Sequence, residues 1–323
     1  MVVILHSTAL LTAETIPQHV FLWVASLGRC GVDLFFALSG FLITRILLET
    51  EGRGDYYKRF YLRRTLRILP LYLVVVVLVM AVSGDSRAVW YLVYFNNIVA
   101  VPTYFAGFTL SHFWSLAVEE HFYAVWPVII RSVKRSQIAG GFVTVWLACL
   151  LLRMGLTEFA FDSDYVWKLT FCRIDALVAG ASVAIAGPIR LSIPVTATAA
   201  LLQAAALLES VAVENGIYIR WALASVSPLW CAWIVGLVSV SKSCWLLNIG
   251  WLRSLGGISY GVYVWHHLFA NQLASVSGTF VRDFGFWGGA LMSFAAMLGL
   301  AVLLARISWV LIEEPFLRLK ECV

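Results

Sequence analysis

The chain of 323 residues is 61% hydrophobic and 13% charged, and its mean hydropathy is +0.87. Soluble domains carry about 25% charged residues, so this composition excludes an ordinary soluble protein. The net charge of +5 comes from basic residues in short loops beside apolar segments, which argues against nucleic-acid binding. We expect an all-α integral membrane protein with one membrane-embedded domain over residues 1–323.

Apolar segments recur along the chain, several of them near the roughly 20 residues that a helix needs to cross hydrocarbon. The aromatic and polar stretch 86–113 is interpreted as an interfacial segment instead of a span. Residues 1–12 are apolar but too short to span, so we expect a first helix truncated at its N-terminus. The sequence predicts a bundle of about ten transmembrane helices, near 1–12, 31–48, 68–83, 114–130, 138–153, 169–187, 192–210, 220–240, 255–275 and 288–312.

Lys and Arg are shared unevenly between the alternate loops of this arrangement. The loops on one side hold 14 of them and the loops on the other side hold 6. Cytoplasmic loops of multi-pass proteins are enriched in these residues, so the richer side is expected to face the cytoplasm. Both termini then lie in the cytoplasm, and the expected location is the inner (cytoplasmic) membrane.

Neither a disulfide framework nor a metal site is expected. No His and Cys cluster has the spacing of zinc ligands, and no CxxC pair occurs. The sequence also lacks GxSxG, Walker, HExxH and GxGxxG motifs, so serine hydrolases, NTPases, zinc proteases and dinucleotide-binding enzymes have no support. The six cysteines are read as small buried apolar side chains: Cys30, Cys149, Cys172, Cys231, Cys244 and Cys322.

Polar residues inside apolar segments are functional candidates, because a charge at the bilayer centre costs about 3 kcal/mol on insertion scales. His6 lies in the first segment. It can be a general base or a hydrogen-bonded packing histidine, and the sequence spacing does not decide between these two roles. Asp33 begins the second segment, where it complements the helix dipole. The face of Asp33, Ala37, Gly40 and Thr44 favours close helix packing, so a structural role is preferred. Ser39 and Gly40 could loosen the backbone near a substrate.

The stretch 56–67, YYKRFYLRRTLR, interleaves basic and aromatic residues. One interpretation is a cytoplasmic anchor that binds anionic lipid. The other is a site for a phosphorylated cytosolic ligand, because Arg63 and Arg67 lie one helical turn apart and guanidinium groups bind phosphate through two hydrogen bonds. Composition favours the anchor, and both can hold.

Carboxylates begin the otherwise apolar stretch 114–126, WSLAVEEHFYAVW. Ser115, Glu119 and Tyr123 follow each other at four-residue spacing and predict a polar stripe on one helix face. Solvation at the outer interface could explain one carboxylate, but function is favoured for the pair Glu119 and Glu120.

Further along the chain, Arg173 and Asp175 lie about 200° apart on a helix and cannot pair with each other. Each therefore needs a partner on another helix, and Arg173 with Glu119 is the candidate ion pair. In SYGVYVWHH, the face of Ser259, Tyr263 and His267 adjoins His266. An aromatic belt at the outer interface explains Tyr263, but it does not explain the adjacent histidines His266 and His267.

Together these motifs resemble the acyltransferase-3 family of multi-pass membrane O-acyltransferases. The resemblance covers the chain from end to end, in the family's order and approximate spacing. The matching stretches are ILH at 4–6, GVDLFFALSGFLITRIL at 31–47, FYLRRTLRILPLY at 60–72, FWSLAVEEHFYAVWP at 113–127, CRIDALVAGA at 172–181, LGGISYGVYVWHH at 255–267 and ISWVLIEEPFLRL at 307–319.

The resemblance implies transfer of an acyl group, usually acetyl from acetyl-CoA, to a hydroxyl of a carbohydrate or glycoconjugate. Acyl-CoA is then a co-substrate, no bound cofactor is expected, and membrane lipid is a further partner. The family's first-helix histidine corresponds to His6, and its RRxxR block to Arg63, Arg64 and Arg67. The family pairs that histidine with a basic residue eleven positions upstream, whereas five residues precede His6 here.

The expected catalytic residues are His6 as general base, Glu119 to orient His6 or the sugar hydroxyls, and Arg173 to stabilise the oxyanion. A transporter or flippase of a lipid-linked saccharide is an alternative, although the chain shows no internal repeat. An inactive truncated family member is another. The expected residues for binding donor and acceptor are Arg63, Arg64, Arg67, Asp33, Ser39, Trp114, Ser115, Glu120, Tyr123, Asp175 and His266.

Overall fold

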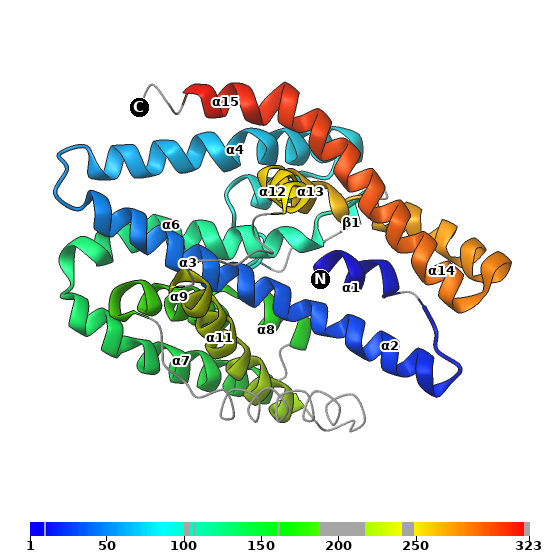
Figure 1. Ribbon diagram of the computed structural model, residues 1–323, viewed down its shortest axis with the longest axis horizontal. Coiled ribbons are helices and arrows are strands. Elements are labelled where there is room, and N and C mark those ends of the chain that lie inside the picture. Colours follow the sequence, from blue (N-terminus) through cyan, green and yellow to red (C-terminus); the bar gives the residue numbers. More distant parts are fainter. Residues whose placement is uncertain are drawn as a thin grey trace. The chain divides into compact units, whose positions relative to one another are not determined.

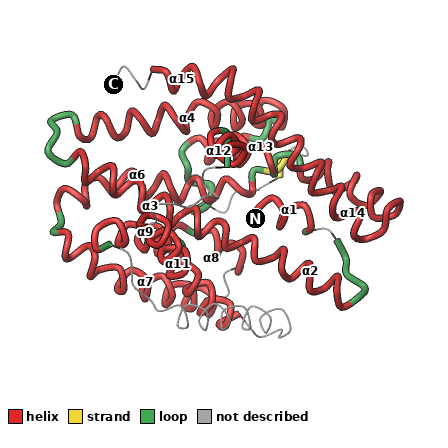
Figure 2. Tube along the Cα trace, in the orientation of Figure 1, coloured by secondary structure: helices red, strands yellow, loops and turns green. Residues whose placement is uncertain are grey.

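The structure is a computed structural model, and it describes residues 1–9, 11–99, 104–105, 108–159, 162–187, 217–240 and 249–319. Helices dominate these residues, and a small antiparallel hairpin of β1 (Tyr104–Phe105) and β2 (Phe108–Thr109) accompanies them (Figure 2). The predicted all-α class is therefore confirmed for the described residues. The predicted span near 192–210 lies outside them.

The chain divides into two compact units, and the organisation as one domain stays a prediction. Unit 1 comprises Met1–Arg29, Asp55–Phe113 and Cys244–Val323, and unit 2 comprises Cys30–Gly54 and Trp114–Ser243. Unit 1 holds α1 (Val2–Thr8), α2 (Ile16–Ser26), α4 (Tyr56–Ser83), α5 (Val89–Leu92), α12 (Gly250–Gly257), α13 (Ser259–His266), α14 (Ala270–Ser308), a π-helical turn (Trp309–Glu313) and α15 (Glu314–Leu319) (Figure 1). Unit 2 holds α3 (Cys30–Thr50), α6 (Trp114–Ser132), α7 (Arg135–Glu158), α8 (Ser163–Lys168), α9 (Ile174–Ala186) and α11 (Ile217–Val240).

Long apolar helices make this a multi-pass membrane protein. Within the described ranges, four helical stretches are long and apolar enough to cross a membrane, and two shorter apolar helices accompany them. The number of about ten is not confirmed. The four stretches are Ile16–Thr50, Tyr56–Ser83, Arg135–Glu158 and Ala270–Leu319, and the shorter helices are Ile174–Ala186 and Ser225–Ser239.

The stretch 13–30 lies between the first two predicted spans and was expected to be a loop. That prediction is wrong, because the stretch contains α2. Thr15 and Gln18 form a capping box, in which the Gln18 side chain accepts from the backbone N–H of Thr15 at 3.1 Å. Pro17 lies in the first turn of the helix, where its missing N–H removes no helical hydrogen bond. These start signals were present in the sequence.

The predicted loop 276–287 does contain a reversal of the chain, at Gly285, but the residues on both sides of it are helical and belong to α14. Gly285 has a φ of 68°, in the region that favours glycine. Ser293 donates to the Ser277 hydroxyl at 2.9 Å, although 16 residues of straight helix would separate them by about 24 Å. The second arm contacts the first closely, since a Cβ at Gly289 would lie 2.6 Å from Val281 Cγ2. The chain therefore forms a helical hairpin inside unit 1.

The predicted segment 255–275 is divided into α12, α13 and the start of α14. Helix α13 packs closely against the end of α14 and the π-helical turn. A Cβ at Gly261 would lie 2.9 Å from Glu313 Oε1 and 3.0 Å from Ala305 Cβ, so only glycine fits this approach. This packing fixes the position of α13, which ends at His266.

Helices α3 and α9 of unit 2 pack backbone against backbone. A Cβ at Gly40 would overlap the carbonyl oxygen of Leu177, and a Cβ at Gly180 would overlap that of Ala37. Thr44, further along α3, accepts from Trp126 Nε1 at 2.8 Å. The packing face that the sequence predicted on α3 is thereby confirmed.

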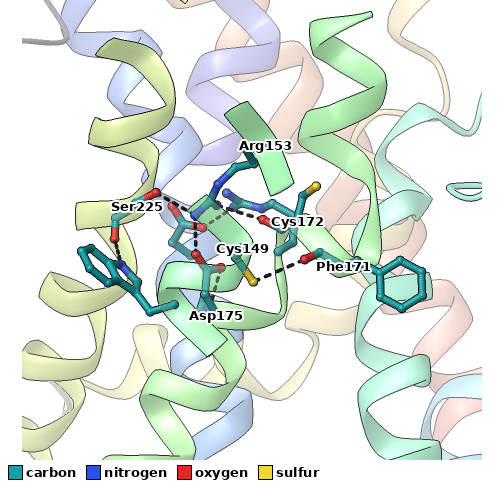
Figure 3. A network of polar contacts seen from close by, with 10 residues as sticks. Cys149, Arg153, Phe171, Cys172, Asp175 and Ser225 are labelled. Atoms are coloured by element: carbon teal, nitrogen blue, oxygen red, sulfur yellow. Dashed lines mark hydrogen bonds and ion pairs between the residues drawn. The ribbon is translucent and has the colours of Figure 1, made fainter. Parts of the chain in front are cut away.

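An arginine that the sequence did not single out joins three helices of unit 2 (Figure 3). Arg153 of α7 pairs with Asp175 of α9 at 2.7 Å, and both side chains are fully buried. The same guanidinium donates to Ser225 Oγ on α11 at 2.7 Å and to the carbonyl oxygen of Cys172 at 2.8 Å. Removing one partner of such a pair leaves a buried, uncompensated charge.

We expect Gly40→Ala to lower the thermal stability of the detergent-solubilised protein by about 1–3 kcal/mol, because backbone atoms cannot rotate away from the added methyl group. Fluorescence-detected size-exclusion chromatography after heating measures this. Gly155→Ala is the matched control, since a Cβ at Gly155 meets nothing within 4 Å. Equal melting curves for the two variants would contradict the close contact.

We expect Arg153→Met to destabilise the protein by about 3–5 kcal/mol, because Asp175 is left buried without its partner. The double variant Arg153→Met with Asp175→Leu should recover much of this loss in the same heating assay. Arg135→Met is the control, because its pair with Glu51 is exposed and should contribute about 0–1 kcal/mol. A double variant no more stable than the single one would contradict the paired-charge explanation.

Candidate active site

Four histidines meet in unit 1. His6 of α1 and His266 of α13 are joined by a hydrogen bond of 3.1 Å between His6 Nδ1 and His266 Nε2, and their rings are parallel. The centroid of the His267 ring lies 4.0 Å from that of His6. The His112 ring lies 5.1 Å from His266 and 5.5 Å from His267. Four of the six histidines in the chain thus form one cluster, which we call the histidine cluster.

Backbone oxygens hold two members of the histidine cluster. His266 Nδ1 donates to the carbonyl oxygen of Tyr263 at 2.6 Å, and His112 Nε2 donates to that of Val264 at 3.0 Å. The Tyr263 hydroxyl donates to the carbonyl oxygen of His112. Both histidines are buried, whereas His6 is only partly buried. His6 therefore retains an accessible side in an otherwise fixed group.

The sequence predicted this cluster in part. His6 and His266 were both candidates, but the expected orienting group for His6 was a carboxylate or a backbone atom, and the structure places an imidazole there. His112 was missed, because the sequence showed only that it lacks zinc-ligand spacing to another histidine. Its position directly before the polar stripe of α6 was the available signal.

Arg173, like Arg153, is a fully buried arginine of unit 2. Its Nη2 pairs with Asp33, where the sequence suggested Glu119. Its guanidinium carbon lies 4.1 Å from the centroid of Trp167 and 5.8 Å from that of Trp114. Nε and Nη1 are buried without a hydrogen-bond partner among the described residues. Arg173 thus keeps two donors, and the sequence was right that its partner lies on another helix.

The polar stripe predicted on α6 exists, and it reaches α3. Tyr123 donates to Glu119 Oε1 at 2.7 Å, and the Tyr123 and Ser39 hydroxyls lie 2.6 Å apart. A phenol has one proton, so Ser39 is the donor to Tyr123 in this chain of hydrogen bonds. All three side chains are buried, as is Ser115 on the same helix face.

The basic block forms the first turns of α4 in unit 1. Arg63, Arg64 and Arg67 are all partly buried, and Arg63 Nε has no hydrogen-bond partner among the described residues. Arg67 lies within the electrostatic reach of Glu313, a buried carboxylate of the π-helical turn that accepts from Ser308. Glu313 was not among the residues predicted from the sequence. Its place between apolar residues in the stretch 307–319 was the signal.

The expected catalytic residues belong to both units. His6 and the basic block lie in unit 1, whereas Glu119 and Arg173 lie in unit 2, so a single site containing all of them stays a prediction. Asp175, expected near substrate, is held by Arg153 instead. Glu120 is partly exposed and Trp114 is buried against Arg173.

Within the ranges that the structure describes, no group of three or more His, Cys, Asp or Glu side chains could hold a metal ion.

Comparison with known proteins identifies related sequences. The sequence model of the acyltransferase-3 family, described as an acyltransferase domain, matches residues 1–306. The peptidoglycan O-acetyltransferase OatA of Listeria monocytogenes is 28% identical, over 80% of this chain and 47% of that protein. The putative peptidoglycan O-acetyltransferase YrhL of Bacillus subtilis is 30% identical, over 94% of this chain and 52% of that protein. A putative O-acetyltransferase of Staphylococcus aureus is 33% identical, over 50% of this chain and 30% of that protein.

No solved structure matches the chain. The chain spans about half the length of the Listeria and Bacillus relatives. The family match, in contrast, covers nearly all of it, and includes the helices that carry the histidine cluster, the basic block and the polar stripe of α6. On this match, the chain belongs to the acyltransferase-3 family.

Proposed function

We propose that this protein is a membrane O-acetyltransferase, which moves an acetyl group from acetyl-CoA to a hydroxyl of a carbohydrate or glycoconjugate. Family membership supports transfer of an acyl group other than an aminoacyl group, and the names of two relatives point to peptidoglycan as the acceptor. The observation that carries the proposal is the place of His6. It pairs with another imidazole in a polar cluster, as a base would, instead of packing among apolar side chains.

In the proposed step, Nε2 of His6 takes the proton of the acceptor hydroxyl while the hydroxyl oxygen attacks the thioester carbonyl of the donor. The carbon–sulfur bond then breaks, and the proton held on His6 passes to the departing thiolate. The products are an acetyl ester and a free thiol. Arg173 is the proposed donor to the oxyanion, since two of its nitrogens are uncommitted, and such a donor contributes about 3 kcal/mol. Glu119, which already accepts from Tyr123, is the proposed orienting carboxylate.

The proposed donor site is the basic block of α4. Three guanidinium groups within two helical turns match the phosphates of acetyl-CoA, and Arg63 Nε is uncommitted among the described residues. The uneven sharing of Lys and Arg between alternate loops supports a block that faces the cytoplasm, where acetyl-CoA is made. Both termini then face the cytoplasm, and the membrane is the inner one.

We expect His6→Ala to lower acetyl transfer by roughly 10²- to 10⁴-fold, the contribution of a general base. Membranes containing the protein are given labelled acetyl-CoA and soluble peptidoglycan fragments, and label in the glycan is counted. His19→Ala, at an exposed histidine of α2, is the control for loss of an imidazole. Undiminished transfer by the His6→Ala variant would rule out His6 as the general base. Movement of a lipid-linked saccharide without acetylation would indicate a transporter instead.

We expect Arg63→Gln and Arg67→Gln to raise the KM for acetyl-CoA by about tenfold or more, because each phosphate contact to a charged group contributes about 1.5–3 kcal/mol. The KM for acetyl-pantetheine, which lacks the nucleotide phosphates, should change little. Lys134→Gln, an exposed lysine outside the block, is the control. If the KM values for acetyl-CoA and acetyl-pantetheine change equally, or if neither changes, the basic block is a lipid anchor only.

A further inference from the structure

We propose that His266 is the positioning residue of the acetyl transfer: it fixes the ring orientation and the tautomer of His6, so that Nε2 of His6 is the free base. This inference rests on the proposed function and adds a residue to it. It replaces the expectation that His266 binds donor or acceptor. Its basis is the order of hydrogen bonds from Tyr263 through His266 to His6 (Figure 1 shows α13 and α1).

The direction of these bonds follows from their last acceptor. A carbonyl oxygen can only accept, so Nδ1 of His266 carries a proton in its 2.6 Å bond to Tyr263. In a neutral imidazole the other nitrogen is then an acceptor, which makes Nε2 of His266 the acceptor in the 3.1 Å bond. His6 must therefore donate through Nδ1. The proton of neutral His6 is on Nδ1, and the lone pair is on Nε2.

His266 is held rigidly enough for this role. Its side chain is 2% exposed, and it ends a helix that packs against Ala305 and Glu313 through Gly261. The carbonyl group that it binds belongs to Tyr263, whose hydroxyl is itself tied to the backbone of His112. An orienting side chain must be fixed by its surroundings if it is to fix another.

His267 completes the enclosure of His6 on another side. Its ring is 4.0 Å from that of His6 and tilted by 52°, and its Nδ1 lies 3.3 Å from Ser111 Oγ. This ring limits rotation of His6 about its side-chain bonds, whereas only His266 makes a hydrogen bond to it among the described residues. The two neighbours therefore have separate effects, and the tautomer depends on His266.

During transfer, the proton from the acceptor hydroxyl arrives at Nε2 of His6, and the resulting imidazolium still donates through Nδ1 to His266. A hydrogen bond whose donor is charged is stronger than a neutral one, so His266 stabilises the charged intermediate more than the resting base. No proton has to leave Nδ1. His266 does not touch the reacting atoms, and its effect is on kcat.

The test compares two substitutions at His266 in membranes carrying the full chain. His266→Gln keeps an amide oxygen near the place of Nε2 and can still accept from His6, whereas His266→Leu fills similar volume without an acceptor. We expect His266→Leu to lower kcat by about 10²-fold, toward the low end of a general base's contribution, with the KM values for both substrates unchanged. His266→Gln should recover most of that loss. His19→Leu is the control.

Folding and function are separated by two further measurements. Equal elution and melting of the Leu and Gln variants shows that both fold, so a difference in kcat then reports the hydrogen bond. Equal kcat for both variants, or a change confined to KM, overturns the proposal. If the wild-type protein transfers no acetyl group, the proposed function fails, and ¹⁵N NMR of the His6 ring still decides the tautomer. A proton on Nε2 of neutral His6 in the wild-type protein overturns the inference.

Discussion

A polar group inside a membrane helix must find its partner within the protein, because hydrocarbon offers none. Unit 2 meets this constraint with two ion pairs that join different helices. Arg153 and Asp175 are fully buried and linked further to Ser225 and to the backbone, so the pair joins α7, α9 and α11. Arg173 and Asp33 form the second pair, on the face where α3 and α9 meet most closely.

The two arginines differ in how many of their donor nitrogens are used. Arg153 uses Nη1 and Nη2 on three acceptors, and its Nε alone has no partner among the described residues. Arg173 uses Nη2 on Asp33, while aromatic rings take up its faces and Nε and Nη1 stay open among the described residues. A buried donor left open costs about 1–3 kcal/mol. Such an arrangement is retained more readily at a site where a ligand oxygen completes it, which is the basis for proposing Arg173 as the donor to the oxyanion.

The sequence predicted the features that depend on local spacing. The stripe of Ser115, Glu119 and Tyr123 and the small-residue face of α3 follow directly from helical periodicity, and both are present. What it could not predict depends on contacts distant in the chain. Arg153 was not singled out, because its partner Asp175 lies 22 positions away. The reversal of the chain falls inside the predicted loop 276–287, but the sequence did not show that it is confined to Gly285 with helix on both sides. The pairing of His6 with His266 spans 260 positions, which no local pattern encodes.

An imidazole is a suitable orienting group for a base inside a membrane protein. A carboxylate in the same place would carry a charge whose burial costs several kcal/mol unless a cation or several donors compensate it. Neutral His266 accepts one hydrogen bond and donates one, so it is satisfied by His6 and the Tyr263 carbonyl group alone. In the proposed reaction, His6 becomes protonated and one charge appears in the histidine cluster. On this proposal the charge is present only during the reaction, and the resting protein avoids the cost of burying an ion pair beside His6.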